Sequence, residues 1–159
     1  MDSALYRHRT SELIDVRISN EQQTHPIDEN RLIDAVNLIT HDAGITQGSV
    51  SLAVVDDPTI HELNVQYLQH DYPTDVLSFV LERDEAMLDG EVIVSADTAA
   101  EDAKTYGWNA NDELLLYVIH GTLHLVGFND KTPDDQAEMH EQEAKYLLKF
   151  GLQHRIDPA

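Results

Sequence analysis

Alternating apolar and polar side chains predict four strands. Residues 13–19 (LIDVRIS) and 49–55 (SVSLAVV) repeat with the two-residue period of a strand that buries one face. Turn-forming residues precede a third strand that begins near Val76, and residues 91–95 (EVIVS) form the fourth. The acidic stretch 82–91 between the last two strands is expected to form a loop.

Five further stretches carry apolar residues at helical spacing and are bounded by residues that favour helix ends. They cover residues 27–44, 57–70, 96–107, 112–127 and 132–151. The fourth is apolar nearly all round and is therefore expected to be buried, with Asn109 or Asn111 as its N-terminal cap. The order β-α-β-α-β-β-α-α-α predicts an α+β fold, in which about five helices pack on a small, mixed, four-stranded sheet.

Length and hydropathy indicate one domain. With 159 residues and 42% hydrophobic composition the chain can fill one core, so residues 1–159 are interpreted as a single domain with a loose terminus at residues 1–10. No run approaches the roughly 18 apolar residues that a membrane span requires, and the N-terminus lacks the charged-then-apolar layout of a signal peptide. We therefore expect a cytoplasmic protein without a membrane partner. The sequence indicates no particular oligomeric state.

The charge and the cysteine content limit which partners the chain can bind and which side chains can hold a metal. The formal charge of −20, from 30 acidic and 10 basic residues, opposes binding to a polyanion, because proteins contact phosphates mainly through Lys and Arg. We interpret the acidity as a solvated surface, suited to a salty cytoplasm, in preference to a role in binding cations or basic partners. The chain has no cysteine, which excludes disulfides, thiolate metal sites and a cysteine nucleophile. Any metal must therefore be held by nitrogen and oxygen.

The stretch HGTLHLVGFND carries the strongest candidate chemistry. On a helix, His120 and His124 lie one turn apart, about 6 Å, and both rings can face one ion. Gly127 can end the helix in a left-handed conformation, which brings Asn129 or Asp130 toward the same point, and Asp130 is the natural third ligand. Three protein ligands with a fourth position left to water form the layout of a catalytic zinc site.

Two histidines at helical spacing also occur as ordinary core residues that are hydrogen-bonded to backbone or carboxylates, and their spacing alone does not separate the two interpretations. The glycine turn and the acid after it favour the metal site. Zinc peptidases carry Glu directly after the first His as general base, whereas Gly121 occupies that position here, which disfavours a peptidase.

Two blocks resemble the YbeY family, the metal-dependent endoribonucleases of ribosomal RNA maturation. HGTLHLVGFND resembles the family signature H-G-x-L-H-L-x-G-Y-D-H, and LNVQYLQHDYPTDVLSF is similar to L-N-x-x-Y-R-x-K-D-x-P-T-D-V-L-S-F. Between them, GEVIVSADTAAEDAKTYGW resembles the family's Gly-Asp-Ile strand and the helix after it. The resemblance covers roughly residues 50–150 and has both motifs in the expected order.

This resemblance implies a fold similar to zincin-like metal hydrolases, with one zinc ion, or another divalent metal, in each chain. His120 and His124 match the first two metal histidines of the family, and Asp130 falls on the third. The three would act in catalysis through a metal-bound water. The implied substrate is RNA, in particular the 3′ end region of the small-subunit ribosomal RNA, and the implied partners are the small ribosomal subunit or its associated proteins.

The site departs from the family pattern at several positions. An aspartate in place of histidine at Asp130 lowers the net charge of the site by one unit, so the metal should be a weaker Lewis acid. Leu68 replaces an arginine suited to a phosphate, and His70 replaces a lysine. Phe128 and Asn129 replace a tyrosine and an aspartate. Together these changes indicate a remodelled centre.

Several other residues have two interpretations. Asp75 could orient a metal-ligand histidine or support a substrate, together with Thr74 and His70, or it could be a turn residue. Glu143 is expected on a solvated face of the last helix, and nothing recommends His154 as a ligand.

Three functions stay open. The first is a zinc-dependent single-strand endoribonuclease of ribosomal RNA maturation and ribosome quality control. The second is a ribosome-associated metal-binding factor with weak or no nuclease activity, and the third is a metal hydrolase that acts on a substrate other than nucleic acid.

Overall fold

The four strands form one mixed sheet with the order β1-β2-β4-β3. The computed structural model describes residues 13–70 and 74–155, so the expected loose terminus at residues 1–10 lies outside the described residues. Strands β1 and β2 are parallel, β2 and β4 are parallel, and β3 runs antiparallel to β4 at one edge. The strands are β1 (Asp15–Asn20), β2 (Gln47–Val55), β3 (Val76–Arg83) and β4 (Met87–Ser95).

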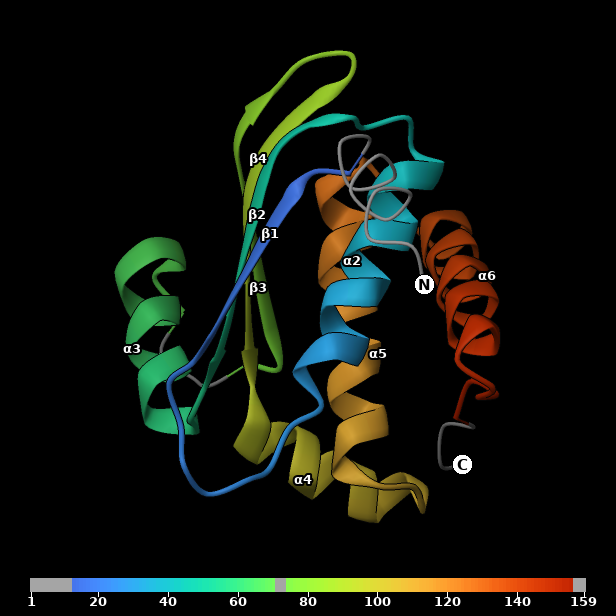
Figure 1. The fold of residues 1–159 in the computed structure, drawn as a ribbon. Coiled ribbons are helices and arrows are strands. Elements are labelled where there is room, and N and C mark those ends of the chain that lie inside the picture. The colour runs from blue at the N-terminus through green and yellow to red at the C-terminus, as the bar shows by residue number, and fades with distance from the viewer. Residues whose placement is uncertain (1–12, 71–73, 156–159) are drawn as a thin grey trace, which may run out of the picture.

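Helices cover both faces of this sheet (Figure 1). Helix α3 lies on one face, while α2 and α5 lie on the other, with α6 packed outside α5 and α4 at one end of the sheet. The helices of the described residues are α2 (Glu29–Asp42), α3 (Asp57–Leu68), α4 (Ala96–Tyr106), α5 (Ala110–Leu125) and α6 (Pro133–Lys149). The predicted α+β fold, with a four-stranded mixed sheet and five helices, is confirmed for this part of the chain.

Helix α5 is the central helix of the core, as its apolar sequence predicts. It is buried along most of its length and packs against β3, β4, α2, α4 and α6. Its close approach to the sheet depends on Gly121, because a Cβ there would lie 2.7 Å from Cγ1 of Val92 and 2.9 Å from Oγ of Ser78. Ser78 also donates a hydrogen bond of 3.0 Å to the carbonyl of Gly121. These contacts fix the helix turn that carries the two candidate histidines.

The prediction of a loop over residues 82–91 is wrong. Strand β3 continues to Arg83 and β4 begins at Met87, so a short turn joins them. The reason is that the alternation of β4 starts earlier than residue 91, since Leu88 is fully buried. Asp89, one of the acidic residues of this stretch, accepts hydrogen bonds from the backbone N–H of Ser49 at 2.9 Å and from its hydroxyl at 3.2 Å. Donors of the neighbouring strand β2 therefore satisfy the carboxylate of an acid in this strand.

Helix ends follow the capping rules with small changes. The cap of α3 is Asp56, directly before the predicted stretch 57–70, and its carboxylate accepts from the N–H of Thr59. Of the two predicted alternatives for α5, Asn109 is the cap. Within the described residues, no helix is long and apolar enough to cross a membrane.

Candidate metal centre

The turn after α5 brings Asp130 back beside the two histidines. Gly127 has a φ of +110°, in the region that favours glycine. Its N–H donates to the carbonyl of His124, and the N–H of Phe128 donates to the carbonyl of Leu123, so the chain reverses directly at the helix end. The predicted left-handed turn is therefore present.

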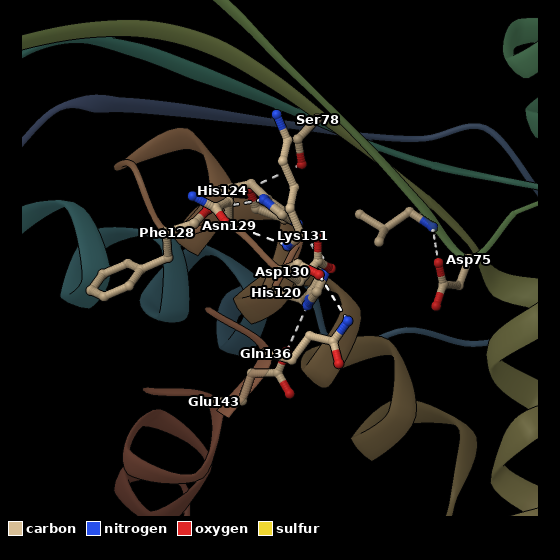
Figure 2. A network of polar contacts seen from close by, with 12 residues as sticks. Asp75, Ser78, His120, His124, Phe128, Asn129, Asp130, Lys131, Gln136 and Glu143 are labelled. Carbon is tan, nitrogen blue, oxygen red and sulfur yellow. Dashed lines mark hydrogen bonds and ion pairs between the residues drawn. The ribbon is translucent and has the colours of Figure 1, made fainter. Parts of the chain in front are cut away.

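Three potential ligand atoms converge at this point (Figure 2). Nε2 of His120 lies 3.0 Å from Nε2 of His124. Oδ2 of Asp130 lies 3.5 Å from the first of these nitrogens and 3.6 Å from the second. A zinc ion about 2.0–2.1 Å from each ligand, in tetrahedral geometry, separates its ligand atoms by roughly 3.4 Å. The spacing of the three side chains therefore fits one divalent ion.

The other nitrogen of each ring shows how the lone pairs are directed. Nδ1 of His124 lies 3.0 Å from the carbonyl oxygen of Phe128, and Nδ1 of His120 lies 2.6 Å from Oε2 of Glu143 (Figure 2). Carbonyl and carboxylate oxygens only accept, so both Nδ1 atoms donate, and in neutral rings both Nε2 atoms present lone pairs. Two such nitrogens 3.0 Å apart, facing a carboxylate, are satisfied by a proton on one Nε2 or by a metal ion that both bind. Histidines whose Nδ1 atoms are held by acceptors while their Nε2 atoms converge have the usual arrangement of metal ligands.

The expectation that Glu143 lies on a solvated face is wrong. Glu143 is only 8% exposed. Its Oε2 accepts a hydrogen bond from His120 on α5, and its Oε1 lies 2.8 Å from Nε2 of His154. The sequence contained a signal for this burial. Glu143 stands four residues after Met139 and three before Tyr146, and all three lie on the buried stripe of α6. A carboxylate at a core position of an amphipathic helix needs a buried partner, and His120 is that partner.

Burial and charge compete at these groups. Burial disfavours the charged form of His120, but the hydrogen bond and negative charge of Glu143 outweigh it, so the pKa of His120 is raised. Burial and the neighbouring His120 lower the pKa of His124. Burial alone would raise the pKa of Glu143, but the hydrogen bonds from His120 and His154 lower it to about 2. Glu143 is therefore a carboxylate that holds its histidine in one orientation, as is usual around metal ligands.

The loop that carries Asp130 is tied to the last helix. Nε2 of Gln136, in the first turns of α6, donates a hydrogen bond of 3.1 Å to the carbonyl oxygen of Asp130 (Figure 2). The side chain of Asp130 is 46% exposed, whereas those of His120 and His124 are 24% and 27% exposed. The site therefore opens to solvent on the side of Asp130.

The remaining predicted residues lie outside this group of three. Oδ1 of Asp75 accepts from the N–H of Val76 at 2.8 Å and from Thr74 at 3.4 Å, which is turn bonding at the start of β3. Asp75 nevertheless lines a hollow of about 230 Å³ together with His120. His70 is exposed directly after α3 and does not belong to the group.

Leu68 is the last residue of α3 and is 43% exposed. Helix α3 lies on the face of the sheet opposite to α5 (Figure 1).

Comparison with known proteins identifies the family. A family profile described as endoribonuclease YbeY matches residues 17–151. Endoribonuclease YbeY of Rhodopirellula baltica is 44% identical over 112 residues, which are 69% of this chain and 58% of that protein. The Carboxydothermus hydrogenoformans relative is 40% identical over 141 residues, 86% of this chain and 97% of its own. The solution structure of TM1509 from Thermotoga maritima matches 83% of this chain and 86% of its own, with a TM-score of 0.59 and 30% identity. The chain therefore belongs to the endoribonuclease YbeY family, the family that its two motifs predict.

Proposed function

We propose that this protein is a zinc-dependent endoribonuclease that cleaves single-stranded RNA during maturation of the small-subunit ribosomal RNA in the cytoplasm. The observation that carries the proposal is the convergence of His120, His124 and Asp130 within 3.6 Å of one another. Membership of a family of endoribonucleases supports RNA as the substrate. Ribosomal RNA and the small ribosomal subunit or its associated proteins are the proposed partners.

The three residues would hold one zinc ion, or a similar divalent ion, in each chain. Such an ion supplies a Lewis acid that activates water and stabilises negative charge on a phosphate. His120 and His124 present neutral nitrogens to it, and their Nδ1 protons are fixed on Glu143 and on the carbonyl of Phe128. Asp130 contributes the exposed third ligand and leaves the solvent side accessible to a substrate.

The charge of the chain favours a second candidate function, a ribosome-associated factor that retains the metal but cleaves RNA weakly. Asp130 adds a negative charge where the family signature has histidine, and Leu68 places an exposed apolar side chain where it has arginine. With a net charge of −20, the chain repels RNA unless local contacts or a basic partner protein compensate.

One experiment separates the two candidates. The purified, untagged protein with a measured metal content is incubated at low salt with a fragment of small-subunit ribosomal RNA, beside His124→Ala. The endoribonuclease proposal expects cleavage by the wild type and none by the variant. Wild-type protein that is loaded with metal and leaves this RNA intact would instead support the weakly active factor. Cleavage by both proteins would show that the centre at His124 is not responsible.

A further inference from the structure

A second cluster of potential ligands lies beside the metal centre. His140 and Glu143 stand three residues apart on α6 and therefore share one face of that helix. His154 comes from the segment after the helix. Each of the three offers one ligand atom, and these atoms lie within 4.8 Å of one another. The imidazole rings of His140 and His154 are already in contact, with centroids 4.0 Å apart.

The hydrogen bonds of His154 direct its second nitrogen into this cluster. Nδ1 lies 3.0 Å from the carbonyl oxygen of Arg155 and must donate to it. Nε2 then faces Oε1 of Glu143 at 2.8 Å. The same arrangement occurs at His124, whose Nδ1 donates to the carbonyl of Phe128 while Nε2 points at the first centre. In a neutral His154 ring the Nε2 lone pair would face the buried carboxylate of Glu143, so the contact needs either a proton on Nε2 or a metal ion that both groups bind.

We propose that His140, Glu143 and His154 bind a second divalent transition-metal ion of the zinc class. Two imidazoles and one carboxylate form a ligand set that zinc uses in proteins, and the chain has no cysteine to compete for the ion. The set repeats the plan of the first centre, because two ligands lie one turn apart on a helix and the third lies on the segment after it.

The two centres share Glu143 but not a ligand atom. Oε2 of Glu143 accepts from His120 and so supports the first centre, whereas Oε1 faces His154. His140 is exposed and lies outside the contacts that hold the first centre. Removing His140 therefore tests the second site without removing a ligand or a support of the first.

Metal stoichiometry decides between this site and a simple ion pair of protonated His154 with Glu143. Untagged protein is stripped with a chelator, loaded with Zn²⁺, dialysed against metal-free buffer, and analysed for zinc per chain. The proposal expects two ions in the wild type and one in His140→Ala, in His154→Ala and in His124→Ala. His41→Ala, an exposed histidine on α2, is the matched control and should keep two.

One ion in the wild type, or two in His140→Ala, would overturn the proposal. The exposed His140 can be replaced without disturbing the core, so this variant remains informative even if His154→Ala unfolds. The measurement needs no RNA. A protein that binds two ions and cleaves nothing would contradict the proposed nuclease function and leave the second site intact.

Discussion

Oε2 of Glu143 accepts a hydrogen bond of 2.6 Å from Nδ1 of His120 across the interface between α6 and α5. This one contact fixes which nitrogen of His120 carries the proton, and therefore which nitrogen is presented to Asp130 and His124. The last helix thus takes part in the centre, although all three proposed ligands of the first ion lie within residues 120–130. The contact makes the orientation of a candidate ligand on α5 depend on a carboxylate of α6.

Replacing Glu143 by Gln should weaken metal binding at the first centre. The amide keeps the shape of the side chain but removes the charge that holds the Nδ1 proton, and loss of such supporting groups commonly costs about 10–100-fold in affinity. The affinity is measured by competition with a chromophoric chelator in a His140→Ala background, where only the first centre is expected to remain. Glu141→Gln in that background is the control, because Glu141 is an exposed acid on the same helix. Equal affinities of the two variants would refute the supporting role.

The same carboxylate gives the metal-free protein a defined pH dependence. The pKa of Glu143 is lowered from 4.5 to about 2, so its contribution to stability is present above pH 4.5 and is lost as the pH falls toward 2. The pKa of His154 is raised from 6.5 despite its burial, because Glu143 accepts its hydrogen bond. Its contribution is therefore complete below pH 6.5 and is lost as the pH rises through the raised value.

The free energy of unfolding of wild type should thus exceed that of Glu143→Gln most between pH 4.5 and 6.5. A difference of about 2 kcal/mol is expected in that window, as for a hydrogen bond to a charged group. Urea denaturation of chelator-treated protein at several pH values measures it, and the comparison of two variants cancels the acidity of the rest of the surface. A difference that stays constant from pH 5 to pH 9 would contradict the assignment.

The first centre could be predicted from the sequence because its geometry is local. A helix places His120 and His124 one turn apart, Gly127 reverses the chain, and Asp130 follows within three residues. No long-range packing has to be known for these side chains to meet. The α+β fold could be predicted for a related reason, since each element carries its own periodicity.

The contacts that hold the histidines of this centre in place could not be predicted from the sequence. Glu143 reaches His120 only because α6 packs on α5, and His154 reaches Glu143 only because the segment after α6 folds back. A periodicity pattern does not state which helices pack together. The strand around Asp89 could not be predicted for a similar reason, because the partner of Asp89, Ser49, lies on a strand 40 positions earlier in the chain.

Replacing Gly121 by Ala should destabilise the protein and disturb the first centre. The added Cβ would lie within 2.9 Å of side-chain atoms of Val76, Ser78 and Val92, so α5 must move away from the sheet. Overpacking of this kind costs about 1–3 kcal/mol. Denaturation measures this cost, and zinc affinity reports whether His120 has moved with the helix.

A second substitution tests the cause of that effect. Val76→Ala removes one of the colliding atoms, so the double variant should be less destabilised than the sum of the two single variants. Strict additivity would mean that the Cβ of residue 121 is accommodated without contact with Val76.

Replacing Leu68 by Arg should raise RNA cleavage if this position limits the activity. An arginine supplies two donors that match a phosphate, and a correctly placed donor of this kind contributes on the order of tenfold or more to a rate. Val65→Arg is the matched control, because Val65 and Leu68 are both 43% exposed on the same helix and both variants change the net charge equally. Cleavage rates are compared at equal metal content over a range of salt concentrations. A higher cleavage rate for Leu68→Arg alone indicates a specific phosphate contact. Equal increases for both variants would mean that the increase comes only from the lower negative charge of the surface.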